Sequence, residues 1–171
     1  MQSLPATPQG RRAARIAFVG IGNTLAGDDG AGIVALERLR TALAGSVNEQ
    51  MFFCTLPGDL YAISEILDAA GRFVFLDALA GETPGELHTL RSDTPFTHAG
   101  SFHQTDIGAV MRTLCALQFR VPFPQWEIRG ITIAPPERLC EGLSMEIDTA
   151  VDRLVVELVG EVRGGAVTLN R

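Results

Sequence analysis

The sequence predicts an α/β fold, namely a three-layer α/β/α sandwich around a twisted, mostly parallel sheet of about five strands. Short apolar runs alternate along the chain with segments of helical periodicity, which is the pattern of βαβ units. Residues 73–76 are apolar at every position, which is typical of a strand covered on both faces. The apolar run 16–19 breaks into glycines and then into Asp28 and Asp29, directly before a helical pattern. Open α/β sheets build sites in this way, so the chain is expected to be an enzyme.

The first half of the chain contains two predicted strand–helix pairs. Residues 15–20 are expected to form the first strand, and residues 51–56 a second buried strand. A helix over 31–43 is predicted because its apolar residues lie close to one face: Ile33, Val34, Leu36, Leu39 and Leu43. Pro57 and Gly58 are expected to turn the chain, and Asp59 to cap a helix. That helix carries Leu60, Ile63, Ile66 and Leu67.

The middle of the chain contains the predicted central and edge strands. The strand 73–76 is expected to end at Asp77, and its uninterrupted apolar character places it in the centre of the sheet. Residues 81–85 are predicted to form a turn into a fourth strand, 86–91, whose polar alternation indicates an edge. Residues 94–102 are expected to form a loop.

The last third contains two predicted helices around one strand. Asp106 is a suitable cap for a helix over 107–118, and residues 126–134 are expected to form the last strand. Ser144 precedes the final helix. The apolar residues that predict this helix are Ile147, Val151, Leu154, Val155 and Leu158.

Length and composition predict a single soluble domain. The chain has 171 residues, of which 46% are hydrophobic and 20% charged. We expect a domain over 15–162, a disordered lead-in over 1–14 and a flexible tail over 163–171. The net charge of −6 opposes a nucleic-acid partner. Membrane spanning is also not expected, because no run approaches the roughly 20 apolar residues required.

A cytoplasmic location is predicted, with a monomer favoured. Arg11 and Arg12 precede an uncharged stretch, but glycines interrupt its apolar segment and acidic residues stand where an export signal would be cleaved. Cys54, Cys115 and Cys140 are few, odd in number and widely spaced, which predicts reduced thiols in the core and no disulfide framework. Since none of these cysteines and no serine lies in a nucleophile motif, a covalent acyl-enzyme is disfavoured.

Two acidic positions and one histidine form the predicted site. Asp28 and Asp29 follow the first strand and Asp77 the central one, so parallel neighbours would bring their carboxylates to one crevice. His103, at the end of a loop that enters a helix, is the third donor. Two carboxylates and an imidazole suit a borderline divalent ion such as nickel or zinc. The alternatives are a turn or cap for Asp77, helix N-terminal charge for the acidic pair, and a local hydrogen bond for the histidine.

The run from Gly20 to Gly32 reads Gly-Ile-Gly-Asn-Thr-Leu-Ala-Gly-Asp-Asp-Gly-Ala-Gly. It resembles the opening signature of the [NiFe]-hydrogenase maturation proteases, a G-x-G-N followed by an acidic pair and glycine. Asp77 and the segment Ser101-Phe102-His103-Gln104 resemble the second acidic position and the histidine segment of that family. The likeness extends through Glu141-Gly142-Leu143-Ser144 to the last helix, and so covers nearly all of the chain after residue 14.

The resemblance implies an endopeptidase that removes the C-terminal extension of a [NiFe]-hydrogenase large-subunit precursor after nickel insertion. It implies that Asp29, Asp77 and His103 are both the catalytic residues and the donors that engage the nickel, which the substrate presents; zinc or another divalent ion could substitute. The type would be aspartic or metal-assisted. Family members often carry an acidic residue and a Gly-Thr-x-Gly turn after the second strand, whereas this chain has Leu56-Pro57-Gly58-Asp59. That difference bears on which hydrogenase is processed.

Three other functions are weighed against this one. A dinucleotide-binding enzyme fits poorly because Leu25 occupies the third glycine position of G-x-G-x-x-G. A peptidyl-tRNA hydrolase also resembles a strand followed by G-x-G-N, but that family continues with Pro-Gly, where this chain has Thr24 and Leu25. A nickel-binding accessory or carrier protein without hydrolytic activity would use the same three donors.

Overall fold

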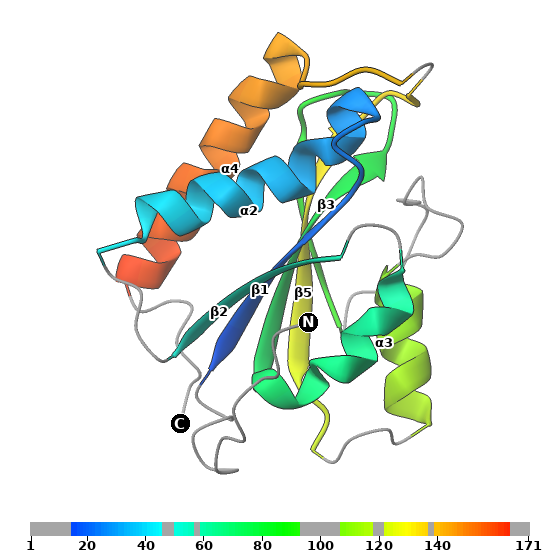
Figure 1. The fold of residues 1–171 in the computed structure, drawn as a ribbon, viewed down its shortest axis with the longest axis vertical. Helices are drawn as coiled ribbons and strands as arrows, with labels where there is room; N and C mark the ends of the chain where they lie inside the picture. Colours follow the sequence, from blue (N-terminus) through cyan, green and yellow to red (C-terminus); the bar gives the residue numbers. More distant parts are fainter. Residues whose placement is uncertain are drawn as a thin grey trace.

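The structure, a computed structural model, describes residues 15–45, 50–56, 59–92, 107–117, 122–136 and 139–164. These residues form one five-stranded sheet in the order β2-β1-β3-β5-β4, with helices on both faces (Figure 1). Neighbouring strands are parallel except for the antiparallel pair β4 and β5. The strands are β1 (Ile16–Ile21), β2 (Met51–Leu56), β3 (Arg72–Ala80), β4 (Leu87–Arg91) and β5 (Gln125–Ile133). The predicted fold class is confirmed.

Two helical layers cover the sheet. One layer contains α2 (Ala31–Ala42) and α4 (Met145–Arg163), which pack on a core with Phe18, Val74 and Ile131. The other contains α3 (Ile107–Ala116) and the short 3-10 segments η2 (Leu60–Glu65) and η3 (Leu67–Ala69). Successive strand residues point to opposite faces, so a strand between two layers is apolar throughout.

The central strand is longer than predicted. β3 does not end at Asp77 but continues to Ala80, since its pairing with β5 runs from Arg72 opposite Gln125 to Ala80 opposite Ile133. Asp77 therefore lies inside a strand, opposite Gly130 of β5. A buried carboxylate interrupts the apolar pattern, but it leaves the backbone hydrogen bonds of a paired strand intact. The prediction that the strand terminates at Asp77 is wrong.

Other predicted elements differ in kind or burial. The helix after Asp59 is two 3-10 segments, although Asp59 does cap the first one by accepting a hydrogen bond from the Tyr61 amide (3.0 Å). β2 lies at an edge of the sheet and is mostly half-buried, so its prediction as a buried strand is wrong. β4 is the other edge, as predicted. The expected loop 94–102, the cap Asp106, the turn residues Pro57 and Gly58, and residues 1–14 and 165–171 lie outside the described residues.

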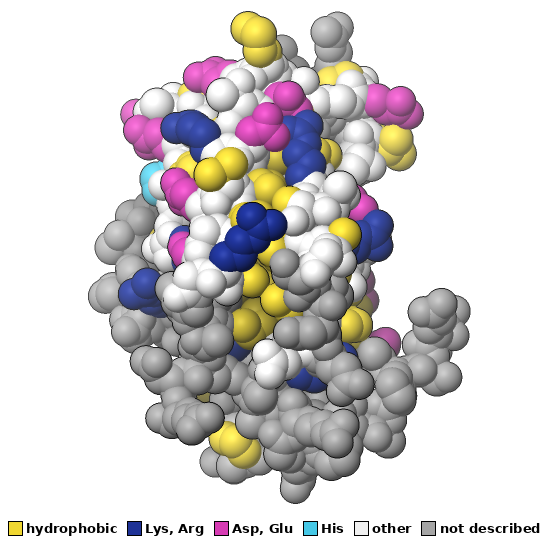
Figure 2. Space-filling view, turned by 90° about the vertical axis from the view of Figure 1, so that its left-hand side faces the viewer, with side chains coloured by type: hydrophobic (Ala, Val, Ile, Leu, Met, Phe, Trp, Pro, Cys, Tyr) yellow, Lys and Arg dark blue, Asp and Glu magenta, His cyan; other side chains and the backbone are white. Residues whose placement is uncertain are grey.

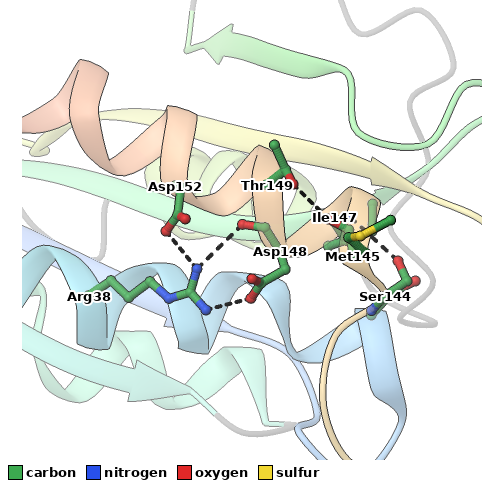
Figure 3. A network of polar contacts seen from close by, with 8 residues as sticks. Arg38, Ser144, Met145, Ile147, Asp148, Thr149 and Asp152 are labelled. Carbon is green, nitrogen blue, oxygen red and sulfur yellow. Dashed lines mark hydrogen bonds and ion pairs between the residues drawn. The ribbon is translucent and has the colours of Figure 1, made fainter.

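The final helix begins at the predicted cap. The Ser144 hydroxyl accepts a hydrogen bond from the Ile147 amide, as an N-cap does. Arg38 on α2 then joins the two helices of this layer by donating to the carboxylates of Asp148 (2.5 Å) and Asp152 (2.7 Å) (Figure 3). The hydrogen bond with Asp148 is the main reason why the pKa of Arg38 is raised. These partly exposed pairs fix geometry more than they add stability.

The cysteines are less buried than predicted. Cys54 is half-buried, but Cys115 and Cys140 are exposed, so the prediction of three core thiols is wrong for these two. Cys115 follows the buried Leu114 and so lies on the outer side of α3, and Cys140 lies in the loop before α4. No disulfide joins the three. Within the described ranges, no helix is both long and apolar enough to cross a membrane.

Candidate active site

The glycines after β1 fold residues 22–30 back on themselves; we call this segment the signature loop. Gly22 has φ = 138°, a conformation that favours glycine, and a Cβ there would overlap the backbone carbonyl oxygen of Asp29. The Asn23 amide donates to that same oxygen (3.3 Å), while the Asn23 side chain accepts from the Leu25 amide (3.0 Å). The G-x-G-N pattern thus closes a tight loop that ends in η1 (Gly27–Gly30), the segment that carries both acidic residues.

Close helix–strand packing brings this loop to the ends of two strands. A Cβ at Gly32, in the first turn of α2, would overlap the carbonyl oxygens of Ile21 and Leu76, at the end of β1 and directly before Asp77. The start of α2 therefore rests against β1 and β3. Asp29 (5% exposed) and Asp77 (1% exposed) are both buried at this edge. β1, which precedes Asp29, and β3, which contains Asp77, are adjacent and parallel as predicted.

Asp77 is held by its own strand. Its Oδ1 accepts a hydrogen bond from the next amide, that of Ala78 (2.9 Å). Because side chains alternate along β3, Asp77 lies on the same face as Phe73 and Phe75, the face covered by α3 and η2. Its partner in the sheet, Gly130, has no side chain, and a Cβ there would overlap the side chain of Leu79. The carboxylate thus occupies a fixed position in an otherwise apolar layer.

The two members of the acidic pair have different surroundings. Asp28 is half-buried, and its Oδ1 accepts a hydrogen bond from the Ser144 amide (2.6 Å) at the start of α4. Two backbone hydrogen bonds also join this loop to the segment 139–144: Gly27 N to Cys140 O (2.7 Å) and Cys140 N to Leu25 O (3.0 Å). Asp28 therefore fixes the loop against α4, whereas Asp29 is the buried carboxylate of the site. Sequence reasoning missed this link because no short-range pattern reports a contact across 116 residues.

His88 lies at the same end of the sheet but serves a local purpose. It is opposite Gly130 on β4, and its Nε2 lies 2.8 Å from the Thr132 hydroxyl oxygen and 3.8 Å from a carboxylate oxygen of Glu86. The Leu79 side chain fills the space above Gly130, between His88 and Asp77.

The third predicted donor, His103, lies outside the described residues. Among the residues that the structure does describe, no group of three His, Cys, Asp or Glu side chains is arranged to hold a metal ion. The described part of the site is therefore a pair of buried carboxylates at the carboxyl edge of β1 and β3. Two carboxylates are oxygen ligands for a divalent ion or acceptors for a proton, and a third donor would have to come from another segment.

Comparison with known proteins gives matches among solved structures. No family model and no curated protein matches the chain. The [NiFe] hydrogenase maturation protease HybD from Thermococcus kodakarensis shares 26% sequence identity with it, with a TM-score of 0.66 over 86% of this chain and 98% of that one.

Two further solved structures are similar in fold. The [NiFe] hydrogenase maturation protease HycI from Thermococcus kodakarensis KOD1 is 23% identical, with a TM-score of 0.67 over 87% of this chain and 92% of that one. An endopeptidase from Escherichia coli is 23% identical, with a TM-score of 0.69 over 90% of this chain and 95% of that one. The chain therefore has the fold of the [NiFe]-hydrogenase maturation proteases, and the resemblance that its signature from Gly20 to Gly32 predicted is confirmed.

Proposed function

We propose that this chain is an endopeptidase that removes the C-terminal extension of a [NiFe]-hydrogenase large-subunit precursor once nickel has been inserted. The observation that supports this most is the burial of Asp29 and Asp77 at the carboxyl edge of adjacent parallel strands, in a fold similar to that of named maturation proteases. In an open α/β sheet this edge is where ligands bind.

The nickel belongs to the substrate in this proposal. Asp29 and Asp77 would supply carboxylate oxygens and His103 an imidazole nitrogen, a set that suits a borderline divalent ion and leaves positions for the precursor's own ligands. A precursor without metal would lack this anchor, so cleavage would depend on the assembly state of the substrate. The ligands of such an ion have to be held in fixed positions by rigid elements. The close packing of Gly32 in α2 on β1 and β3 provides this rigidity.

Two chemical routes to hydrolysis use the same residues. In one, the ion polarises the scissile carbonyl or lowers the pKa of a bound water. In the other, a carboxylate of Asp29 or Asp77 acts as general base toward the attacking water. Both routes need at least one ionised carboxylate close to the scissile bond, and neither needs a cysteine or serine nucleophile.

The decisive experiment compares nickel-loaded with empty precursor. Incubation with the wild-type protein followed by intact mass measurement is expected to show loss of a C-terminal segment from the loaded form only. Asp29→Asn, Asp77→Asn and His103→Ala are expected to lower the cleavage rate by at least about 100-fold, since each removes a donor rather than its support.

Two matched controls separate loss of a donor from loss of a fold. Asp152→Asn removes an exposed carboxylate on α4, and His88→Ala removes a histidine bonded to Thr132; both should cleave at nearly the wild-type rate. Full processing by the Asp77→Asn variant would contradict the assignment. Binding of the loaded precursor without any mass loss would instead favour a nickel-binding accessory protein.

A further inference from the structure

Three large apolar side chains stand exposed beside the proposed site. Leu25 is 57% exposed, Leu139 78% and Met145 87%. Leu25 belongs to the signature loop, Leu139 to the segment before α4, and Met145 begins α4. We call these three residues the apolar patch. Exposed apolar side chains gathered in one place are unusual for a surface without a partner.

Backbone contacts join the segments that carry the patch. Ala26 and Cys140 form a parallel β-bridge, so the residues one position earlier, Leu25 and Leu139, are neighbours across it. Met145 follows Ser144, whose amide is held by the Asp28 carboxylate. Each member of the patch is therefore tied to the loop that carries Asp29.

The described segments that carry the patch are acidic. Residues 22–30 and 139–148 contain Asp28, Asp29, Glu141, Glu146 and Asp148, and no lysine or arginine. Figure 2 shows Asp and Glu side chains, together with Lys or Arg side chains, near separate exposed apolar ones at the upper end of the face it presents. Two described arginines near these segments have partners: Arg38 binds Asp148 and Asp152, and Arg153 donates to the Gly85 carbonyl (2.6 Å).

We propose that the apolar patch is the docking surface for an extended segment of the precursor near its cleavage site, and that this segment carries apolar side chains flanked by lysine or arginine. The inference rests on the proposed function and adds the substrate chemistry to it. Apolar side chains at the centre and an acidic rim are complementary to such a segment, and the shared loop places the bound segment beside Asp29.

The test uses steady-state cleavage of nickel-loaded precursor by the full chain. The double variant Leu139→Ser/Met145→Ser should raise KM about 10-fold or more while kcat stays near the wild-type value, because binding and not chemistry is weakened. Val156→Ser and Leu117→Ser change equally exposed apolar residues elsewhere (72% and 70% exposed) and should leave KM unchanged.

A second pair of substitutions tests the acidic residues around the apolar patch. Glu141→Lys/Glu146→Lys should also raise KM, and the rise of the wild-type KM with added salt should become weaker in this variant. Direct binding of the loaded precursor, measured by fluorescence anisotropy, should report the same weakening in Kd for both double variants.

The outcomes separate this inference from the proposed function. Cleavage by the wild type with an unchanged KM and Kd in both double variants would overturn the docking surface and leave the peptidase intact. Binding without cleavage by the wild type would overturn the peptidase, and the Kd comparison would still decide on the patch. Absence of both binding and cleavage would overturn both.

Discussion

At the scale of single residues, neighbouring acids in one motif have different tasks. Asp29 is buried at the edge of β1 and β3, while Asp28 next to it accepts the Ser144 amide hydrogen bond. The sequence predicted that the pair lies at this edge and offered helix N-terminal charge as the alternative. Asp28 does bind at a helix N-terminus, because its carboxylate accepts from the amide of Ser144, the N-cap of α4. Only the tertiary contact distinguishes the two residues.

Removal of the Asp28 carboxylate should therefore destabilise the fold. Asp28→Ala leaves the Ser144 amide without this acceptor, and we expect a loss of about 1 kcal/mol in the free energy of unfolding, as for the loss of a helix cap. Asp28→Asn keeps an oxygen acceptor and should lose less. Urea denaturation followed by circular dichroism measures both, and an unchanged unfolding midpoint for Asp28→Ala would show that the contact contributes nothing.

The three cysteine thiols should also differ in reactivity, because they differ in burial. Burial raises the pKa of Cys54 to about 12, whereas Cys115 and Cys140 are exposed. At pH 8 we expect two thiols per chain to react quickly with a disulfide reagent and the third only slowly, because the thiolate is the reacting form. Cys54→Ala should keep both fast thiols. Three equally fast thiols would contradict the burial of Cys54.

The same pKa shift predicts how stability changes at alkaline pH. An acid whose pKa is higher in the folded than in the unfolded state favours folding less as pH rises, because the unfolded chain ionises first. The contribution of Cys54 is therefore lost as pH rises from 9.0 toward about 12. Comparison of the wild type with Cys54→Ala by urea denaturation across this range should show a smaller decline in the variant.

At the scale of elements, the periodic segments could be predicted and the local exceptions could not. The apolar repeats predicted α2 nearly to its ends and α4 from its cap Ser144 onward, and the uninterrupted apolar run identified β3 as central. The end of β3 was misplaced because strand pairing with β5 overrides the polar residue Asp77. The 3-10 form of η2 and η3 depends on tertiary packing, which periodicity does not report.

The junction of α2 with the sheet should tolerate no side chain at Gly32. A Cβ there would overlap the carbonyl oxygens of Ile21 and Leu76, so Gly32→Ala should destabilise the protein by about 3 kcal/mol and displace the loop that carries Asp29. Gly160→Ala is the matched control, because nothing lies within 4 Å of a Cβ at that position in α4.

The control should shift stability in the opposite direction. Alanine is favoured over glycine in a helix by about 1 kcal/mol, so Gly160→Ala should raise the unfolding midpoint. Thermal and urea unfolding of both variants measure the difference. Equal stability of Gly32→Ala and the wild type would mean that α2 can move away from β1 and β3, and the rigid placement of Asp29 would then lose its basis.

At the scale of the whole molecule, stability and the proposed chemistry use different charged groups. Glu127 on β5 is buried and lies near three arginines: Arg129 (3.1 Å), Arg72 (3.3 Å) and Arg91 (3.7 Å). Arg129 also pairs with Glu161 of α4 (2.7 Å). This network faces the α4 layer, whereas Asp77 faces the α3 layer and lies three positions further along the sheet, opposite Gly130. Two sets of buried charges are thereby separated by the sheet itself.

This separation predicts that a substitution in the Glu127 network lowers stability without lowering the cleavage rate, and that a substitution of Asp77 does the reverse. Glu127→Gln leaves three arginines around a neutral side chain, so the free energy of unfolding should fall by about 3 kcal/mol, while the cleavage rate per folded molecule at 25 °C stays near the wild-type value. Glu37→Gln breaks only an exposed pair with Arg40 and should cost less than about 0.5 kcal/mol. Asp77→Asn should abolish cleavage with little loss of stability. If Glu127→Gln lowered the cleavage rate of the folded protein as strongly as Asp77→Asn, the two faces of the sheet would be coupled, and the site could not be a local property of the carboxyl edge.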